Sequence, residues 1–111
     1  MDLNSITTAK ISWADLPEKE LKGKTGSTLY KEALSGNTRM RLAEYSAGYE
    51  SAEWCDKPHL LHCIKGKLTL HLKSGKDVEL NSGDSIFLSP ADPHTASTGN
   101  TSALLFIADD I

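Results

Sequence analysis

The stretch GYESAEWCDKPHLLHCIKG, residues 48–66, contains both cysteines and two of the four histidines of this chain. Glu53, Cys55 and His59 flank the turn-forming run Asp56-Lys57-Pro58. Residues two apart in a strand share a face, so Glu53 and Cys55 should point to the same side. A proline-containing turn can bring His59 back beside them. The spacing therefore predicts two short strands whose carboxylate, thiol and imidazole suit a metal site, provided that a fourth donor comes from elsewhere in the chain.

Length and composition describe one ordinary globular domain. The chain has 111 residues, of which 39% are hydrophobic and 24% are charged, and this composition favours neither disorder nor a fibrous repeat. The length suffices for one buried core and is too short for two. The net charge of -3 argues against nucleic acid or an anionic membrane as a partner.

The sequence also carries expectations about the compartment. No apolar run approaches the roughly 20 residues that cross a bilayer, and the start, MDLNSITTAK, has neither the basic nor the apolar region of a signal peptide. Two cysteines, Cys55 and Cys63, are few for a disulfide scaffold and fit a reducing compartment. We therefore expect a cytoplasmic protein with free thiols.

Most of the chain shows the alternation of short strands. Segments 28–33 and 38–45, joined by Ser35-Gly36-Asn37, predict a hairpin. Further strands are predicted at residues 60–64, 67–73, 77–80, 85–88 and 103–107, the last an apolar run suited to burial on both faces. Short strands separated by Gly, Pro, Asn and Asp, with hardly any helix, indicate a sandwich or barrel.

The first 27 residues differ in character from the rest. They are polar and rich in turn formers, with Trp13, Leu16 and Leu21 as isolated apolar residues. Residues 15–21 predict one helical turn with Pro17 near its first position. We expect residues 1–27 to be a mostly irregular arm that packs on a barrel of residues 28–111.

A second motif lies at residues 83–94, GDSIFLSPADPH. Its glycine, aspartate, proline and histidine resemble the second motif of the small single-domain cupins, with Ala91 in place of a common glycine. Counted back from Gly66, the two histidines of the first cupin motif fall on Glu53 and Cys55, and its glutamate falls on His59. The donor types are exchanged, yet each position still carries a side chain that can bind a metal.

The altered first motif is similar to that of the DHCW-motif cupins, which have an Asp-His-Trp-Cys run, a turn and then a histidine. Here the run is Ala52-Glu53-Trp54-Cys55, and His59 follows. The departures are Ala52 for the aspartate and Glu53 for the histidine.

The resemblance implies an all-β jelly-roll barrel, the cupin double-stranded β-helix, with a small-molecule ligand inside it. It also implies that Glu53, Cys55, His59 and His94 face inward and bind a divalent transition metal. The soft sulfur of Cys55 favours zinc or iron over magnesium or calcium. His62 and His71 lie outside the motif positions, and we interpret both as structural or surface residues.

Two functions remain open at this point. One is metal-dependent chemistry on a small molecule in the barrel, such as an oxygenase or isomerase reaction. The other is non-catalytic binding or sensing of a small ligand, with Glu53 marking a site that has lost its metal. The sequence shows no nucleophile and base pair, phosphate loop or dinucleotide motif, which argues against hydrolases, kinases and dehydrogenases of familiar design. The chain alone does not decide whether the protein is an enzyme.

Two tryptophans suggest an assembly. Trp54 is expected on the outer face of the site strand and Trp13 in the sparse arm, and both need cover. Because exposed sheet faces and edges are usually buried or blunted, we expect a homodimer.

Overall fold

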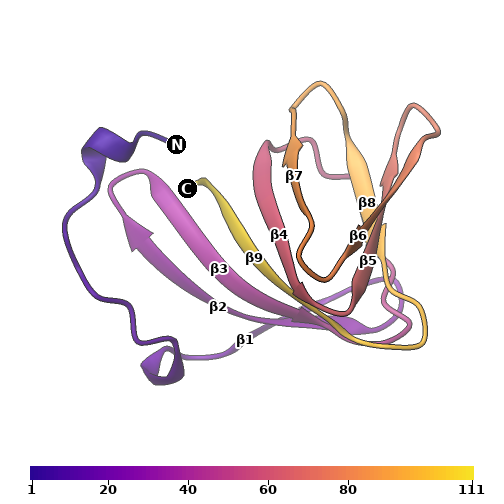
Figure 1. The fold of residues 1–111 in the computed structure, drawn as a ribbon, viewed down its shortest axis with the longest axis horizontal. Helices are drawn as coiled ribbons and strands as arrows, with labels where there is room; N and C mark the ends of the chain where they lie inside the picture. Colours follow the sequence, from indigo (N-terminus) through magenta and orange to yellow (C-terminus); the bar gives the residue numbers. More distant parts are fainter.

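The computed structural model covers residues 1–111 and forms two antiparallel sheets (Figure 1). One sheet has six strands in the order β1-β2-β3-β9-β4-β7, and the other has three in the order β6-β5-β8. The only helical elements are two short 3-10 turns, neither of which is long or apolar enough to cross a membrane. This arrangement confirms the predicted all-β jelly-roll class. The elements are the turns Leu3–Ser5 and Trp13–Asp15 and the strands β1 Lys19–Lys22, β2 Ser27–Ser35, β3 Thr38–Tyr45, β4 His59–Lys65, β5 Lys67–Leu72, β6 Asp77–Asn81, β7 Ser85–Leu88, β8 His94–Ser97 and β9 Ala103–Asp110.

The predicted hairpin is present as β2 and β3. Ser35 pairs with Thr38, so the turn has two residues, and its first residue, Gly36, has a φ of 56°. A type II′ turn requires a positive φ at this position, which glycine adopts without strain. Any side chain at Gly36 would also collide with Ser5 of the first 3-10 turn.

The core lies between the two sheets and follows the predicted alternation. Leu61 and Cys63 of β4 and Leu68 and Leu70 of β5 are buried, as the period of two requires. Strand β9 differs from the expectation of burial on both faces. Ala103, Leu105 and Ile107 are buried, whereas Leu104 and Phe106 are half-buried, because only one face of β9 lies against the other sheet.

The N-terminal arm contains a strand where a helical turn was predicted. The 3-10 turn Trp13–Asp15 ends before Pro17, and Leu16 is extended with φ -85° and ψ 145°, the conformation favoured before proline. Residues 19–22 then pair with β2 as β1, beginning with Lys19 opposite Tyr30. The arm therefore covers the free edge of β2, on the side of the molecule away from β5, β6 and β8 (Figure 1).

The stretch that carries Glu53 and Cys55 is a loop, so the predicted strand at 53–55 is wrong. Isolated bridges join Glu50 to Ser97 and Cys55 to His94. Four residues lie between Glu50 and Cys55, but only two lie between their partners Ser97 and His94, so two residues of the first segment have no partner. Ser51 still donates its amide to the carbonyl of Ala96, so the ladder breaks after it and residues 52–54 bulge out of the sheet.

Candidate metal centre

A cavity of about 630 Å³ opens between the two sheets. Its apolar wall includes Leu61 of β4, Leu68 and Leu70 of β5 and Ile107 of β9. The residues of the bulged loop lie along its mouth. This volume falls within the usual range of about 300–1,000 Å³ for small-molecule sites.

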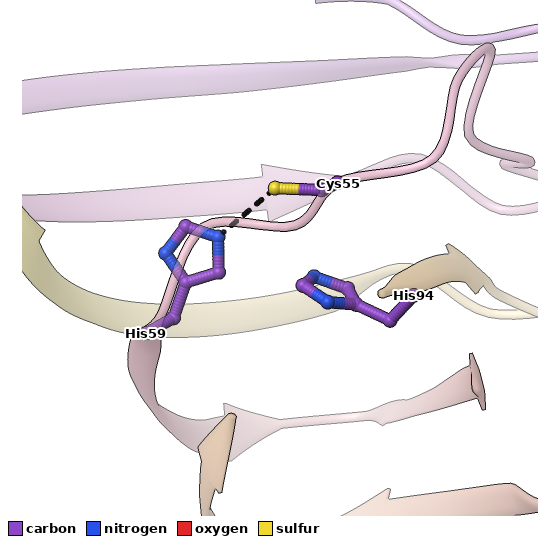
Figure 2. A group of neighbouring side chains, drawn as sticks. All are labelled: Cys55, His59 and His94. Carbon is purple, nitrogen blue, oxygen red and sulfur yellow. Dashed lines mark hydrogen bonds between the residues drawn. The ribbon is translucent and has the colours of Figure 1, made fainter. Parts of the chain in front are cut away.

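Three predicted donors meet in this cavity. Cys55, His59 and His94 offer ligand atoms that all lie within 4.8 Å of one another. The Sγ of Cys55 is 3.3 Å from the Nε2 of His59, and the rings of His59 and His94 meet edge to face with centroids 5.5 Å apart (Figure 2). Both histidines are buried and Cys55 is half-buried.

Backbone pairing fixes these donors relative to one another. His59 is the first residue of β4 and His94 the first of β8. The amides of Cys55 and His94 each donate to the other residue's carbonyl at 2.9 Å. A rigid Pro93 immediately precedes His94. The bridge thus holds Cys55 beside the cluster even though its neighbours form a loop.

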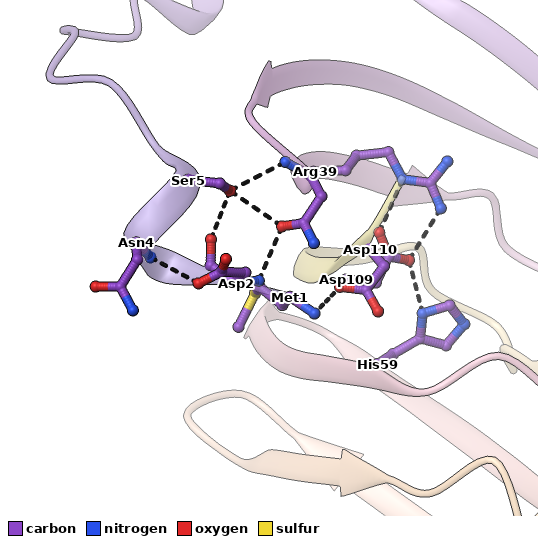
Figure 3. Close-up of polar contacts among 9 residues, drawn as sticks. Met1, Asp2, Asn4, Ser5, Arg39, His59, Asp109 and Asp110 are labelled. Carbon is purple, nitrogen blue, oxygen red and sulfur yellow. Dashed lines mark hydrogen bonds and ion pairs between the residues drawn. The ribbon is translucent and has the colours of Figure 1, made fainter.

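A carboxylate that the sequence reading missed orients His59. The Nδ1 of His59 lies 2.8 Å from Oδ2 of Asp109, near the end of β9 (Figure 3). Arg39 donates two hydrogen bonds to the same carboxylate, at 2.8 and 3.0 Å, and Arg41 donates one at 2.8 Å. The side chain of Asp109 is only 2% exposed. The sequence did contain a signal for this role. Asp109 comes two residues after the buried Ile107, so strand alternation places its acidic side chain on the inward face.

The network keeps Asp109 ionised. Burial by itself would raise the pKa of Asp109, but the hydrogen bonds from His59 and Arg39 and the charges of Arg41 and Arg39 hold that pKa well below its usual range. An ionised carboxylate only accepts hydrogen bonds, so the proton of a neutral His59 belongs on Nδ1. This assignment leaves the lone pair of Nε2 directed toward Cys55.

His94 is held in its neutral form. Burial disfavours the imidazolium and the nearby His59 adds repulsion, so the pKa of His94 is lowered. The backbone of Asp92, close to the His94 ring, opposes this shift. It forms no hydrogen bond of standard geometry with the ring, so the buried Nδ1 of His94 has no partner. A neutral imidazole with an unpaired nitrogen is the form that binds metals.

The structure does not bring Glu53 into this group. Its side chain is exposed on the bulged loop at the cavity mouth, because the broken ladder removes the strand alternation that would have placed it beside Cys55. Trp54 also lines the mouth, 52% exposed, with Nζ of Lys73 5.8 Å from its ring centroid. The expectation that Trp54 packs on an outer sheet face is therefore wrong.

The remaining histidines and the second cysteine have structural surroundings. His62 contacts the Oγ of Ser85 at 2.7 Å, and His71 lies between Asp77 and Ser97. Both cysteines are free, and Cys63 is fully buried in the core, where burial raises the pKa of its thiol.

The donors fit a transition metal. Zinc bonds of about 2.3 Å to sulfur and 2.0 Å to nitrogen, at tetrahedral angles, place two donors roughly 3.5 Å apart. The 3.3 Å between Cys55 and His59 matches this spacing, and small side-chain movements would close the remaining separations. One sulfur and two nitrogens are a donor set typical of zinc or iron.

The same atoms also form a nucleophile and base pair, which the sequence reading did not find. Cys55, His59 and Asp109 stand in a chain of two contacts, at 3.3 and 2.8 Å. A thiol beside an imidazole that a carboxylate orients is the arrangement of an activated nucleophile. Cys55 and His59 are only four residues apart, but the carboxylate that completes the pattern was hidden because Asp109 lies 50 residues beyond His59.

Comparisons with known proteins identify the fold. No protein-family model and no curated protein matches this sequence. Among solved structures, the polyketide cyclase RemF from Streptomyces resistomycificus has a TM-score of 0.80 at 15% identity, covering 94% of this chain and 80% of its own. The iron(II) form of HppE has a TM-score of 0.73 at 13% identity, with 94% and 60% covered.

A third similar structure is described as cupin-like. The cupin-like protein from Thermotoga maritima has a TM-score of 0.64 at 19% identity, covering 76% of this chain and 68% of its own. At these identities the likeness concerns the fold, and it agrees with the two-sheet topology and with the motif at residues 83–94. The chain is therefore a small protein with the cupin fold.

Proposed function

We propose that this protein is a metal-dependent cupin in which Cys55, His59 and His94 hold one divalent transition metal, zinc or iron, at the floor of the cavity. The observation that carries the proposal is the convergence of the three donor atoms within 4.8 Å. The iron(II) in the HppE structure supports it, because that protein shares the fold.

The residues around the donors favour this role. Asp109 accepts a hydrogen bond from Nδ1 of His59, an arrangement that orients metal-binding histidines and raises their basicity. The lowered pKa of His94 keeps its ring neutral. Three protein donors leave an open coordination position, as in catalytic rather than structural metal sites.

The cavity provides room for a small-molecule substrate beside the donors. When bound, the metal would supply Lewis-acid or oxygen chemistry at the open position, which fits an isomerase or oxygenase reaction. The apolar wall of leucines and Ile107 would exclude water from a bound substrate and hold its apolar part. Glu53, exposed at the mouth, is proposed as an optional fourth donor that the loop would carry inward.

Metal analysis tests the proposal. Protein purified without added metal should contain about one zinc or iron per chain, measured by elemental analysis. The double variant His59→Ala/His94→Ala should retain less than a tenth of it. The matched control, His62→Ala/His71→Ala, should keep the full content, because these histidines lie outside the cavity. Metal that persists in the first double variant, or wild type that takes up none on reconstitution, would refute the assignment.

The contacts of Cys55 with His59, and of His59 with Asp109, favour a second candidate, in which Cys55 acts as a nucleophilic thiol without a metal. Alkylation by iodoacetamide, followed by mass spectrometry, separates the two. Under the metal proposal, added zinc should protect Cys55, and chelation should expose it. Rapid alkylation that zinc does not slow, and that His59→Ala does slow, would favour the thiol. Cys63 serves as the internal control because it is fully buried.

A further inference from the structure

Two arginines form part of the cavity wall next to the metal donors. Arg39 and Arg41 lie on β3, line the cavity, and have side chains 21% and 19% exposed. Both pair with a single carboxylate, that of Asp109. The wall therefore carries more positive charge than its own acidic residue neutralises.

The other charges of the cavity do not cancel this excess. Four further charged side chains line it, all exposed at the rim, and they balance one another, two cations against two anions: Lys22, Lys57, Glu53 and Asp56. The inner wall thus holds two guanidinium groups, with the carboxylate of Asp109 paired to both. Glu32, opposite Arg41 on β2, is itself paired with Lys19, so a net charge of +1 remains. A divalent metal with one thiolate ligand would add another +1, so the excess persists whether or not the metal is bound.

The hydrogen bonds show which arginine remains available. Arg39 uses both Nε and one terminal nitrogen on Asp109. Arg41 uses only one terminal nitrogen, and its Nε is buried with no partner. A guanidinium has five donors in a planar fork, so Arg41 keeps most of its capacity. That Nε is closed off from solvent, so a ligand in the cavity would meet the terminal nitrogens of Arg41, which make only the one hydrogen bond to Asp109.

The rest of the lining defines what accompanies the acid group. Tyr45 contributes a phenol whose pKa burial raises to about 12, so it stays neutral and can donate a hydrogen bond. Tyr49 packs edge to face against it with ring centroids 5.0 Å apart. The opposite wall is aliphatic, and the volume of about 630 Å³ admits only a small molecule.

We propose that the cavity binds a small organic carboxylate with an apolar body, and that Arg41 receives its acid group. A planar carboxylate matches the fork of a guanidinium and forms paired, charge-assisted hydrogen bonds with it. The inference deepens the proposed function by naming the class of ligand for the same cavity. It requires no metal, because the charge and the donors belong to the chain itself.

Ligand binding to metal-free protein tests this inference apart from the metal proposal. Chelated wild type is titrated by isothermal calorimetry with propionate, benzoate and succinate, and with the amide of each. At least one acid should bind at least tenfold more tightly than its amide. Inorganic phosphate is the comparison for simple charge attraction and should bind more weakly than that acid.

Substitutions then locate the acid group. Arg41→Gln should weaken binding of the acid at least tenfold, Arg41→Lys should restore part of it, and Lys57→Gln at the rim should change it less than twofold. Circular dichroism verifies that each variant is folded. If Arg41→Gln does not fold, the test uses Arg41→Lys, which should still bind the acid more weakly than wild type. Equal binding of acids and amides, tightest binding of phosphate, undiminished binding by the Arg41 variants, or no binding of any acid at millimolar concentration would overturn the inference. The metal content is measured separately and tests the proposed metal centre independently of acid binding.

Discussion

The Nδ1 of His59 and the Oδ2 of Asp109 lie 2.8 Å apart, although 50 residues separate them in sequence. This contact joins the first residue of β4 to the end of β9 and turns Nε2 of His59 toward Cys55 (Figures 2 and 3). It also couples the candidate metal centre to the two arginines of β3 through one buried carboxylate. The same buried carboxylate therefore orients a candidate metal ligand and pairs with the arginines of the sheet.

Replacing Asp109 should weaken both metal binding and the fold. Asp109→Asn removes the charge that orients His59, and loss of such a partner typically costs 10–100-fold in metal affinity. It also leaves two half-buried guanidinium groups without the carboxylate to which both are hydrogen-bonded, so the free energy of unfolding should fall by about 3 kcal/mol. Zinc competition with a chromophoric chelator and urea unfolding measure the two effects.

The neighbouring carboxylate offers a matched control for that experiment. Asp110 pairs with the N-terminal amine and is half exposed (Figure 3). Asp110→Asn should therefore change zinc affinity less than twofold and stability by under about 1 kcal/mol. If both variants behave alike, the effect is one of general charge and Asp109 does not orient His59.

Cys55 should give a bound metal a sulfur signature. Cobalt(II) in the wild-type site should show the intense near-ultraviolet absorption of a thiolate ligand, and Cys55→Ser should lose it, because a hydroxyl is a harder and poorer ligand. Cys63→Ala is the control and should keep the band, since Cys63 is buried in the core. Persistence of the band in Cys55→Ser would exclude Cys55 from the site.

Tyr45 predicts a loss of stability at high pH. Burial raises its pKa from 10.0 to about 12, so the folded state keeps a proton that the unfolded state releases. The contribution is fully present below pH 10 and should be lost between about pH 10 and 12, up to roughly 2 kcal/mol. Urea unfolding across this range measures it. Tyr45→Phe should flatten the profile, and an unchanged slope in that variant would assign the loss to other groups.

Gly36 should be costlier to replace than Gly75, although both have positive φ. Gly36→Ala forces a side chain into Ser5 and adds left-handed strain of about 1–2 kcal/mol. Gly75 has a φ of 99° and open space around it, so Gly75→Ala should cost only the strain. Thermal unfolding should rank the variants in that order, and the reverse order would show that the 3-10 turn does not pack on the hairpin.

The homodimer stays a prediction, but the exposed apolar residues that argue for it are not those expected from the sequence. Trp54 lies at the cavity mouth, but other apolar side chains are exposed, above all Phe87, at 86% exposure on the edge strand β7. Light scattering should give twice the mass of one chain at micromolar concentration. A monomer mass that does not change with concentration would exclude the assembly.

The sequence by itself determined most of the strands and three of the four expected donors. Alternation of apolar residues placed Leu61, Cys63, Leu68 and Leu70 on the inward faces, because side-chain direction in a strand repeats every two residues and is a local property. The two motifs likewise singled out Cys55, His59 and His94, which the fold brings together. Their spacing reflects short strands and turns whose geometry depends on neighbouring residues.

Only the tertiary structure decided the rest of the site. The bulge that removes Glu53 from the donor group follows from an unequal count between residues 50–55 and 94–97, two segments that meet only after folding. Asp109 and Arg41 gain their roles because β9 lies between β3 and β4 in the sheet. Strand order and the pairing of distant charges depend on how the whole chain buries its apolar faces, and no local pattern encodes them.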